Sequence, residues 1–119
     1  MAAGNYGLDN LTVFVDNNNL QIDGTIEEVM SPYPIDEKFR AFKWNVITID
    51  GHDYAQIADA IDAAKEAKGR PTMIVAKTVK GKGVSFMENN VKFHGSTPTA
   101  EQFEQAFKEL DAQIASLEV

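Results

Sequence analysis

Three apolar, β-branched runs stand out in the hydrophobic pattern of the chain. They are Leu11 to Val15, Asn45 to Ile49, and Thr72 to Val79. Each run is nearly continuous rather than alternating, which is typical of strands buried on both faces of a parallel sheet. The pattern therefore predicts three buried strands.

Two helical patterns lie between these runs. The first, Ile35 to Phe42, follows two prolines and has acidic residues in its first turn. The second begins after Asp53, a predicted N-cap, and ends before Gly69 and Pro71. Its apolar positions at helical spacing are Tyr54, Ile57, Ala58, Ile61 and Ala64.

A third helix is predicted from Thr99, which forms a capping box with Gln102. One face of this helix carries an apolar stripe that we expect to be buried against another surface. The stripe consists of Phe103, Ala106, Phe107, Leu110 and Ile114.

The order strand, helix, strand, helix, strand predicts right-handed βαβ crossovers. The expected fold class is α/β, with a three-layer-type parallel sheet and flanking helices. Three parallel strands leave unpaired backbone groups on both outer strands. We therefore expect further protein to complete the sheet.

Composition narrows the function classes. A length of 119 residues fits one small domain, and no apolar stretch approaches the roughly 20 residues that span a bilayer. With no basic and apolar leader after Met1, we expect a cytoplasmic protein that is not bound to a membrane. The net charge of −7 disfavours nucleic acid as a partner, and the absence of cysteine excludes disulfides and thiolate metal sites.

The best candidate chemistry is the run Asp16 to Asn19, which follows the first predicted strand. Open α/β sheets bind ligands at the carboxyl ends of their strands. The amide oxygen of asparagine is a neutral, hard ligand that suits Mg²⁺ or Ca²⁺. The alternative is a strand that simply ends in a polar turn.

Four groups of segments, in this order and spacing, closely resemble transketolase. They are Leu8 to Gly24, Phe42 to Val46 with Asp50 to Asp53, Ala76 to Glu88, and Phe93 to Gly95. More narrowly, they resemble its amino-terminal, thiamine-diphosphate-binding section, which some organisms encode as a separate subunit. The resemblance implies that residues 1–119 form a single partial domain of the thiamine-diphosphate-binding fold.

The resemblance lacks the first half of the family's thiamine motif. That motif opens with Gly-Asp-Gly, whose aspartate is a Mg²⁺ ligand, and this chain contains no such tripeptide. Met1 to Tyr6 resembles the end of the helix that joins the two halves of the motif. We therefore expect a truncated domain, a piece of a larger polypeptide.

The family pattern assigns the metal ligands. Asn18 would give its side-chain oxygen and Leu20 its main-chain carbonyl to Mg²⁺, with Ca²⁺ as a substitute. Since Mg²⁺ takes six oxygens, the cofactor phosphates, the absent aspartate and water would supply the rest. Asn17 and Asn19 are expected to be turn residues.

Three further residues match cofactor positions of the family. Ile22 would pack on the cofactor's ring system, although a buried turn isoleucine is the alternative. Lys80 would lie near the diphosphate, with a solvated loop lysine as its alternative. His94 matches a histidine at the diphosphate and the substrate channel, and it is our catalytic candidate. His52 is expected to be a turn residue.

The resemblance implies transfer of a two-carbon ketol unit between sugar phosphates, as in the pentose phosphate pathway. The missing amino-terminal segment and a pyrimidine-binding domain or subunit would complete the enzyme, so we expect the isolated chain to be inactive. Because its sheet is incomplete, we also expect the chain to form homo-oligomers. Another thiamine enzyme, such as deoxyxylulose-phosphate synthase or a dehydrogenase E1 component, is a close alternative, but the stretch from Lys80 to His94 favours transketolase. Two different classes remain: a non-catalytic α/β module or truncated product that binds no cofactor, and a flavodoxin-like or response-regulator-like phosphate binder.

Overall fold

A computed structural model describes residues 1–117. The chain divides into two compact units. The first contains Met1–Asn18 and Met30–Thr78, and the second contains Asn19–Val29 and the chain from Val79 onward.

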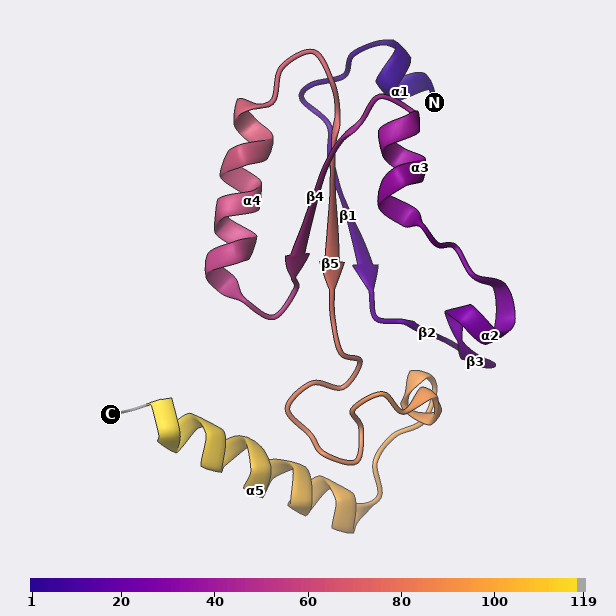
Figure 1. The fold of residues 1–119 in the computed structure, drawn as a ribbon. Coiled ribbons are helices and arrows are strands. Elements are labelled where there is room, and N and C mark those ends of the chain that lie inside the picture. Colours follow the sequence, from indigo (N-terminus) through magenta and orange to yellow (C-terminus); the bar gives the residue numbers. More distant parts are fainter. Residues whose placement is uncertain (118–119) are drawn as a thin grey trace. The chain divides into compact units, whose positions relative to one another are not determined.

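The first unit is built on a parallel sheet with strand order β1-β5-β4 (Figure 1). Its elements are α1 (Ala2–Asn5), β1 (Thr12–Asn17), α3 (Ile35–Ala41), β4 (Asn45–Asp50), α4 (Tyr54–Glu66) and β5 (Thr72–Lys77). All three predicted strands and both predicted helices of this region are confirmed. The third strand ends at Lys77, two residues before the predicted end.

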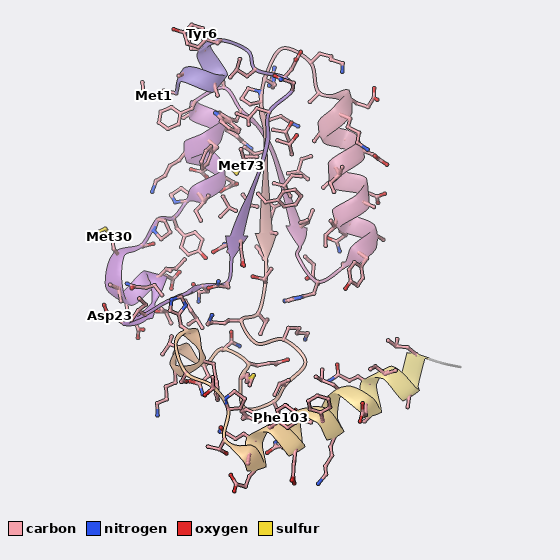
Figure 2. All side chains as sticks on the ribbon, turned by 180° about the vertical axis from the view of Figure 1, so that it is seen from behind. Met1, Tyr6, Asp23, Met30, Met73 and Phe103 are labelled. Atoms are coloured by element: carbon pink, nitrogen blue, oxygen red, sulfur yellow. The ribbon has the colours of Figure 1, made fainter. Side chains whose placement is uncertain are left out.

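The two faces of the sheet carry separate apolar clusters. On one face, Met73 and Val75 pack with Trp44, and Phe39 of α3 covers them. On the other face, Ile74 and Ala76 pack with Ile49 and with Ala60 of α4. Figure 2 labels Met73 on the central strand. Helices therefore cover both faces, and the predicted three-layer α/β arrangement is confirmed.

Burial on both faces is confirmed only for β5. In β1 the exposed and half-buried positions alternate, and Phe14 is 47% exposed. Thr48 of β4 is also exposed. The prediction was wrong for these two strands because each lies at an edge of the sheet, where helices cover one face incompletely.

Helix α4 begins as predicted and packs through part of the predicted face. The Asp53 carboxylate accepts hydrogen bonds from the backbone amides of Ala55 (2.9 Å) and Gln56 (3.1 Å), so Asp53 is the N-cap. The predicted apolar positions Tyr54 and Ala58 are exposed. The buried face consists of the predicted Ala64 and of Ala60, which was not predicted, with the predicted Ile57 packed beside them. Small alanines let the helix approach the sheet closely.

The second unit contains a hairpin of two short strands with two residues each, a long loop and the last helix. Its elements are β2 (Leu20–Gln21), β3 (Gly24–Thr25), η1 (Val91–His94) and α5 (Ala100–Leu117), while α2 (Ile26–Met30) continues from β3 into the first unit. The capping box before α5 is confirmed, since Gln102 N donates to Thr99 Oγ1 (3.3 Å) and Thr99 N donates to Gln102 Oε1 (3.0 Å). The β2–β3 hairpin was not predicted, because two-residue strands leave no periodic pattern.

Among the described residues, no helix combines the length and the apolar character that a membrane crossing requires.

Candidate functional site

The strand ends place polar residues in one row. Asn17 of β1 pairs with Lys77 of β5, which in turn pairs with Asp50 of β4. All three strands are parallel, so their carboxyl ends meet at the same edge of the sheet. The candidate site of the first unit therefore lies at this edge, where Asn18 continues the chain.

Two side chains of the polar run are tied to the fold. The Thr78 hydroxyl donates a hydrogen bond to Asp16 Oδ1, and the Tyr33 hydroxyl donates to Asn17 Oδ1 at 3.1 Å. Asn17 is the last residue of β1, so its prediction as a turn residue was wrong. It differs from the prediction because the strand runs two residues past the apolar segment.

Asn19 confirms the other turn prediction. Its backbone is left-handed, with φ of +61°, a conformation that asparagine tolerates better than most residues. Its carbonyl accepts a hydrogen bond from Ile26 N at 3.1 Å. The three asparagines thus have three separate backbone settings, and Asn18 stands between the strand end and this turn.

The exit from β4 passes close to the exit from β5. Gly51 N donates to the Lys77 carbonyl at 2.7 Å, and a Cβ on Gly51 would lie 2.5 Å from Thr78 Cγ2. Glycine is therefore required at this approach. His52 follows in the turn, and its backbone amide donates a hydrogen bond to Asp50 Oδ1 at 2.9 Å. Its prediction as a turn residue is therefore confirmed.

The hairpin of the second unit holds two predicted residues. Leu20 pairs with Thr25 across the hairpin, and Ile22 lies in the connecting turn, where it is 68% exposed. The alternative of a buried turn isoleucine is therefore wrong. An exposed isoleucine at a hairpin tip has an apolar surface available to a ligand or to another segment of protein.

Lys80 lies in a loop that is held in shape by backbone contacts. The Lys80 carbonyl accepts from Asn89 N at 3.0 Å. Gly81 has φ of +74°, and a Cβ there would lie 2.6 Å from the Met87 carbonyl oxygen, so the loop requires glycine at this position. The neighbouring Lys82 ammonium lies 3.8 Å from Glu88. Within residues 1–117 the Lys80 ammonium has no such carboxylate partner, so its charge is available to an anion.

His94 is the last residue of η1 and is exposed. Asn90 caps this short helix by accepting from Lys92 N at 3.1 Å, and the Phe93 ring packs on Phe86 with centroids 5.5 Å apart. These contacts fix the backbone of the segment. No hydrogen bond of the described residues joins His94 to Lys80, so each side chain is positioned by its own part of the loop.

The donor set fits a hard cation only in part. The described residues contain no group of three histidine, cysteine, aspartate or glutamate side chains that could hold a metal ion. The predicted donors, the Asn18 side chain and the Leu20 carbonyl, are neutral oxygens of the kind that Mg²⁺ accepts. Asp16, the nearest carboxylate in sequence, is engaged by Thr78. Most of the charge on a metal at this site would have to be balanced by the ligand that it carries.

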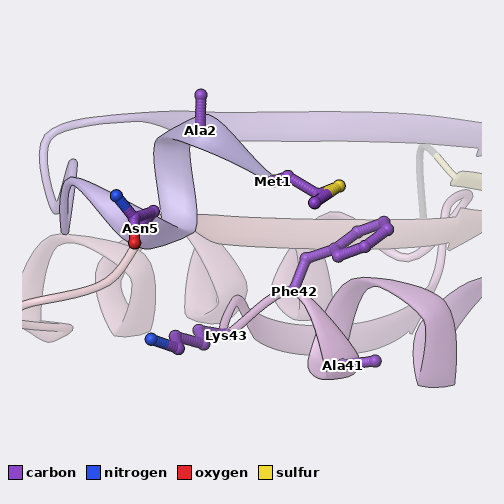
Figure 3. Close-up of a pocket in the computed structure, with 6 residues that line it drawn as sticks. All are labelled: Met1, Ala2, Asn5, Ala41, Phe42 and Lys43. Atoms are coloured by element: carbon purple, nitrogen blue, oxygen red, sulfur yellow. The ribbon is translucent and has the colours of Figure 1, made fainter.

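A separate pocket of the first unit contains none of the predicted site residues. It has a volume of about 360 Å³ and lies where α1 meets the end of α3 (Figure 3). Its lining is Met1, Ala2, Asn5, Ala41, Phe42 and Lys43. Lys43 is the one titratable side chain among these lining residues.

Comparisons with known proteins match the whole described chain. The family model described as "Transketolase, thiamine diphosphate binding domain" matches residues 1–117. A 6-deoxy-6-sulfo-D-fructose transketolase subunit from Clostridium sp. (strain MSTE9) is 43% identical over 115 residues, which are 97% of this chain and 42% of the relative. An apulose-4-phosphate transketolase subunit from Phocaeicola vulgatus is 41% identical over 118 residues, 99% of this chain and 42% of the relative.

The fold is also similar to that of solved transketolases. One of them is the crystal structure of transketolase from Campylobacter jejuni, which is 32% identical in sequence and superimposes with a TM-score of 0.83. The match covers 91% of the present chain and 17% of the Campylobacter jejuni chain. The chain thus spans less than half the length of the two curated relatives, and it resembles a part of each of them.

Proposed function

Because the chain belongs to the transketolase family of thiamine diphosphate binding domains, we propose that it forms part of a site for thiamine diphosphate and Mg²⁺. Residues 1–119 would be one partial cofactor-binding domain. Together with the parts of such a protein that this chain does not span, it would transfer a two-carbon ketol unit between sugar phosphates. The observation that carries the proposal is the level row of strand ends, Asn17, Lys77 and Asp50, from which Asn18 continues the chain.

In this proposal Asn18 and Leu20 hold the metal. The Asn18 amide oxygen and the Leu20 carbonyl oxygen supply two neutral ligands, and Ca²⁺ can replace Mg²⁺ at such oxygens. The position of Asn18 supports this assignment, because it directly follows the last residue of β1. The hydrogen bonds from Thr78 to Asp16 and from Tyr33 to Asn17 position the end of that strand.

Lys80 would bind the diphosphate of the cofactor, and Ile22 would bind its ring system. The Lys80 ammonium has no carboxylate partner among the described residues and would act as a point charge toward the diphosphate. The exposed side chain of Ile22 would pack on the ring system. When bound, thiamine diphosphate supplies an electron sink for carbon–carbon bond cleavage.

His94 is the proposed catalytic residue. Its imidazole is exposed, and it is held on a backbone that Asn90 and Phe93 fix. Histidine is the side chain that changes charge near neutral pH, so it can donate to a phosphate or substrate oxygen, or move a proton there.

The relatives support a multi-subunit enzyme. Two of them are named as transketolase subunits, one for a phosphorylated and one for a sulfonated sugar. We propose that this chain likewise works with a segment carrying Gly-Asp-Gly and a pyrimidine-binding domain or subunit, in a homo-oligomeric assembly in the cytoplasm. Sugar phosphates of the pentose phosphate pathway are its proposed substrates.

Calorimetric titration with thiamine diphosphate and Mg²⁺ tests the proposal. We expect binding with Kd below about 10 μM, roughly −7 kcal/mol, once a segment supplying the Gly-Asp-Gly aspartate is present. Asn18→Ala should weaken binding at least tenfold, and so should removal of Mg²⁺. Asn10→Ala, at an exposed asparagine of the same unit, is the matched control and should leave Kd unchanged.

His94→Ala separates binding from catalysis. It should lower ketol transfer by the assembled enzyme far more than it raises the cofactor Kd, while His52→Ala serves as the control for loss of an imidazole. If thiamine diphosphate gives no heat even with the completing segment, the proposed function is wrong and a non-catalytic module remains.

A further inference from the structure

The tripeptide Ile-Asp-Gly occurs twice in the chain, as Ile22-Asp23-Gly24 and as Ile49-Asp50-Gly51. An aspartate that precedes glycine can react with its own backbone, because glycine has no Cβ to hinder the approach of its amide nitrogen to the aspartate side chain. The chain contains no Asn-Gly pair, which would undergo the related deamidation. Local sequence predicts similar reactivity for the two tripeptides, so a difference between them must come from the structure.

The reaction needs no partner except water. The glycine amide nitrogen forms a bond to the side-chain carboxyl carbon of aspartate, and the carboxyl hydroxyl leaves with the amide proton as water. This closes a succinimide ring. Water then adds to one of the two ring carbonyls and breaks the C–N bond there. Addition at the side-chain carbonyl restores aspartate, whereas addition at the main-chain carbonyl gives isoaspartate, in which the backbone runs through Cβ and Cγ.

The tripeptide at the end of β4 is held at both reacting groups. The Asp50 carboxylate accepts a hydrogen bond from His52 N at 2.9 Å, and Gly51 N donates to the Lys77 carbonyl at 2.7 Å. A Cβ on Gly51 would lie 2.5 Å from Thr78 Cγ2, so the backbone has little room to turn. The isoleucine of this tripeptide is 6% exposed and belongs to the core.

The other tripeptide lies at the tip of the β2–β3 hairpin, where Figure 2 labels Asp23. Ile22 is 68% exposed, and Asp23 is exposed as well. Within residues 1–117 the Asp23 carboxylate has no hydrogen-bond partner. A Cβ on Gly24 would meet no atom nearer than Glu28 Oε2, at 3.4 Å. Ring closure therefore meets less steric resistance here than at Gly51.

The hairpin is also a weak restraint on the reacting amide. It consists of the two pairs Leu20 with Thr25 and Gln21 with Gly24. The strand after Gly24 is held by the Thr25 hydroxyl, which donates to Glu28 Oε2 at 2.8 Å. A two-stranded ladder of this size is marginally stable, so it opens far more often than the edge of a packed sheet.

We propose that Asp23 is a site of spontaneous backbone isomerisation to isoaspartate, and that its contacts protect Asp50 from the same reaction. This inference goes beyond the proposed function, since the chemistry is intramolecular and requires neither cofactor nor partner. The product carries one more carbon in the backbone of the hairpin. The pairing of Gln21 with Gly24 cannot keep its register across that insertion.

Incubation of the full chain without cofactor tests the proposal. The chain is kept at physiological temperature and mildly acidic pH, once in buffer and once in urea, until a synthetic peptide of residues 20–26 has converted by half. Electron-transfer fragmentation of the proteolytic peptides then distinguishes isoaspartate from aspartate at each position. Methylation by an isoaspartyl methyltransferase measures the total amount of isoaspartate independently.

In buffer we expect at least tenfold more isoaspartate at position 23 than at position 50, and urea should remove this difference. Glu28→Ala removes the contact with Thr25 and should raise the rate at position 23 at least twofold, without changing position 50. Asp23→Glu is the matched control, because its longer side chain would have to close a larger ring, and it should give no product at position 23. Circular dichroism verifies that each variant stays folded.

Three results would overturn the proposal. Similar amounts of isoaspartate at positions 23 and 50 in buffer would mean that the contacts of Asp50 give no protection. Absence of product at position 23 when the peptide is half converted would mean that the hairpin holds Asp23 as firmly as the sheet holds Asp50. A difference that persists in urea would assign the reactivity to the following residue, Thr25 or His52, and not to the structure.

Discussion

Truncation of Ile74 to alanine gives a direct test of the three-layer core. Ile74 is fully buried at the centre of β5 and packs with Ile49, Ala60 and Ala76. The substitution removes three carbons, which at about 0.8 kcal/mol per buried methylene costs about 2.4 kcal/mol. A cavity between sheet and helix adds to this, so we expect a loss of about 3–4 kcal/mol in the free energy of unfolding. Ile74→Val should cost only about 1 kcal/mol.

Ile61→Ala is the matched control, since it makes the same chemical change on α4 at a residue that is 36% exposed. It should cost no more than about 1.5 kcal/mol, because little cavity forms and alanine favours the helix. Urea unfolding followed by Trp44 fluorescence gives the three values. Trp44 is the only tryptophan and is buried on the opposite face of the same sheet, so its emission reports on the first unit.

A loss below about 1.5 kcal/mol for Ile74→Ala, or one no larger than that of Ile61→Ala, would refute the reasoning. It would mean that α4 does not pack on β5 as described. A change in the urea m-value would instead indicate that the variant alters the cooperativity of the unit.

Three further predictions concern two side-chain hydrogen bonds and one glycine. Tyr33→Phe removes the hydrogen bond to Asn17 and should lower the urea unfolding free energy by about 1 kcal/mol. Gly81→Ala forces a side chain onto a backbone with φ of +74°, so amide hydrogen exchange across the 79–89 loop should accelerate. The Ser85 hydroxyl, and then its amide, hold the pKa of Glu109 below its ordinary value of 4.5. Since the folded pKa is lowered, this stabilisation is complete above pH 4.5 and is lost as the pH falls through the folded value. Protection of the Ser85 amide should therefore decrease on acidification in the native chain, and Glu109→Gln should flatten that dependence.

The sequence predicts the first unit well because its elements are long and its signals agree. Near-continuous apolar runs located the strands, and Asp53 marked the start of α4 by a hydrogen-bonding preference that needs no tertiary information. The burial of individual positions was less predictable. Ala60 and not Ala58 faces the sheet, because a helix rich in alanine has no strong apolar side to orient it.

Contacts between distant segments could not be predicted. Tyr33 lies sixteen residues from Asn17, between two prolines and outside any periodic pattern, yet its hydroxyl holds the Asn17 side chain. In the same way, Thr78 reaches Asp16 across sixty-two positions only because β1 and β5 pair in register. Such partners follow from strand order, which an isolated sequence does not specify.

The asparagine run illustrates why residue type alone does not assign a metal ligand. Asn17, Asn18 and Asn19 are chemically identical, but the strand ends at the first, and the third adopts a left-handed turn. The Tyr33 hydroxyl occupies the side-chain oxygen of Asn17, and the backbone of Asn19 closes onto Ile26. Asn17, which precedes Asn18, is thus held by a side-chain hydrogen bond, and Asn19, which follows it, is held by a backbone hydrogen bond. Residue type predicts the same ligand chemistry for all three asparagines, whereas the backbone conformation and hydrogen bonds of each position decide which oxygen a cation can reach.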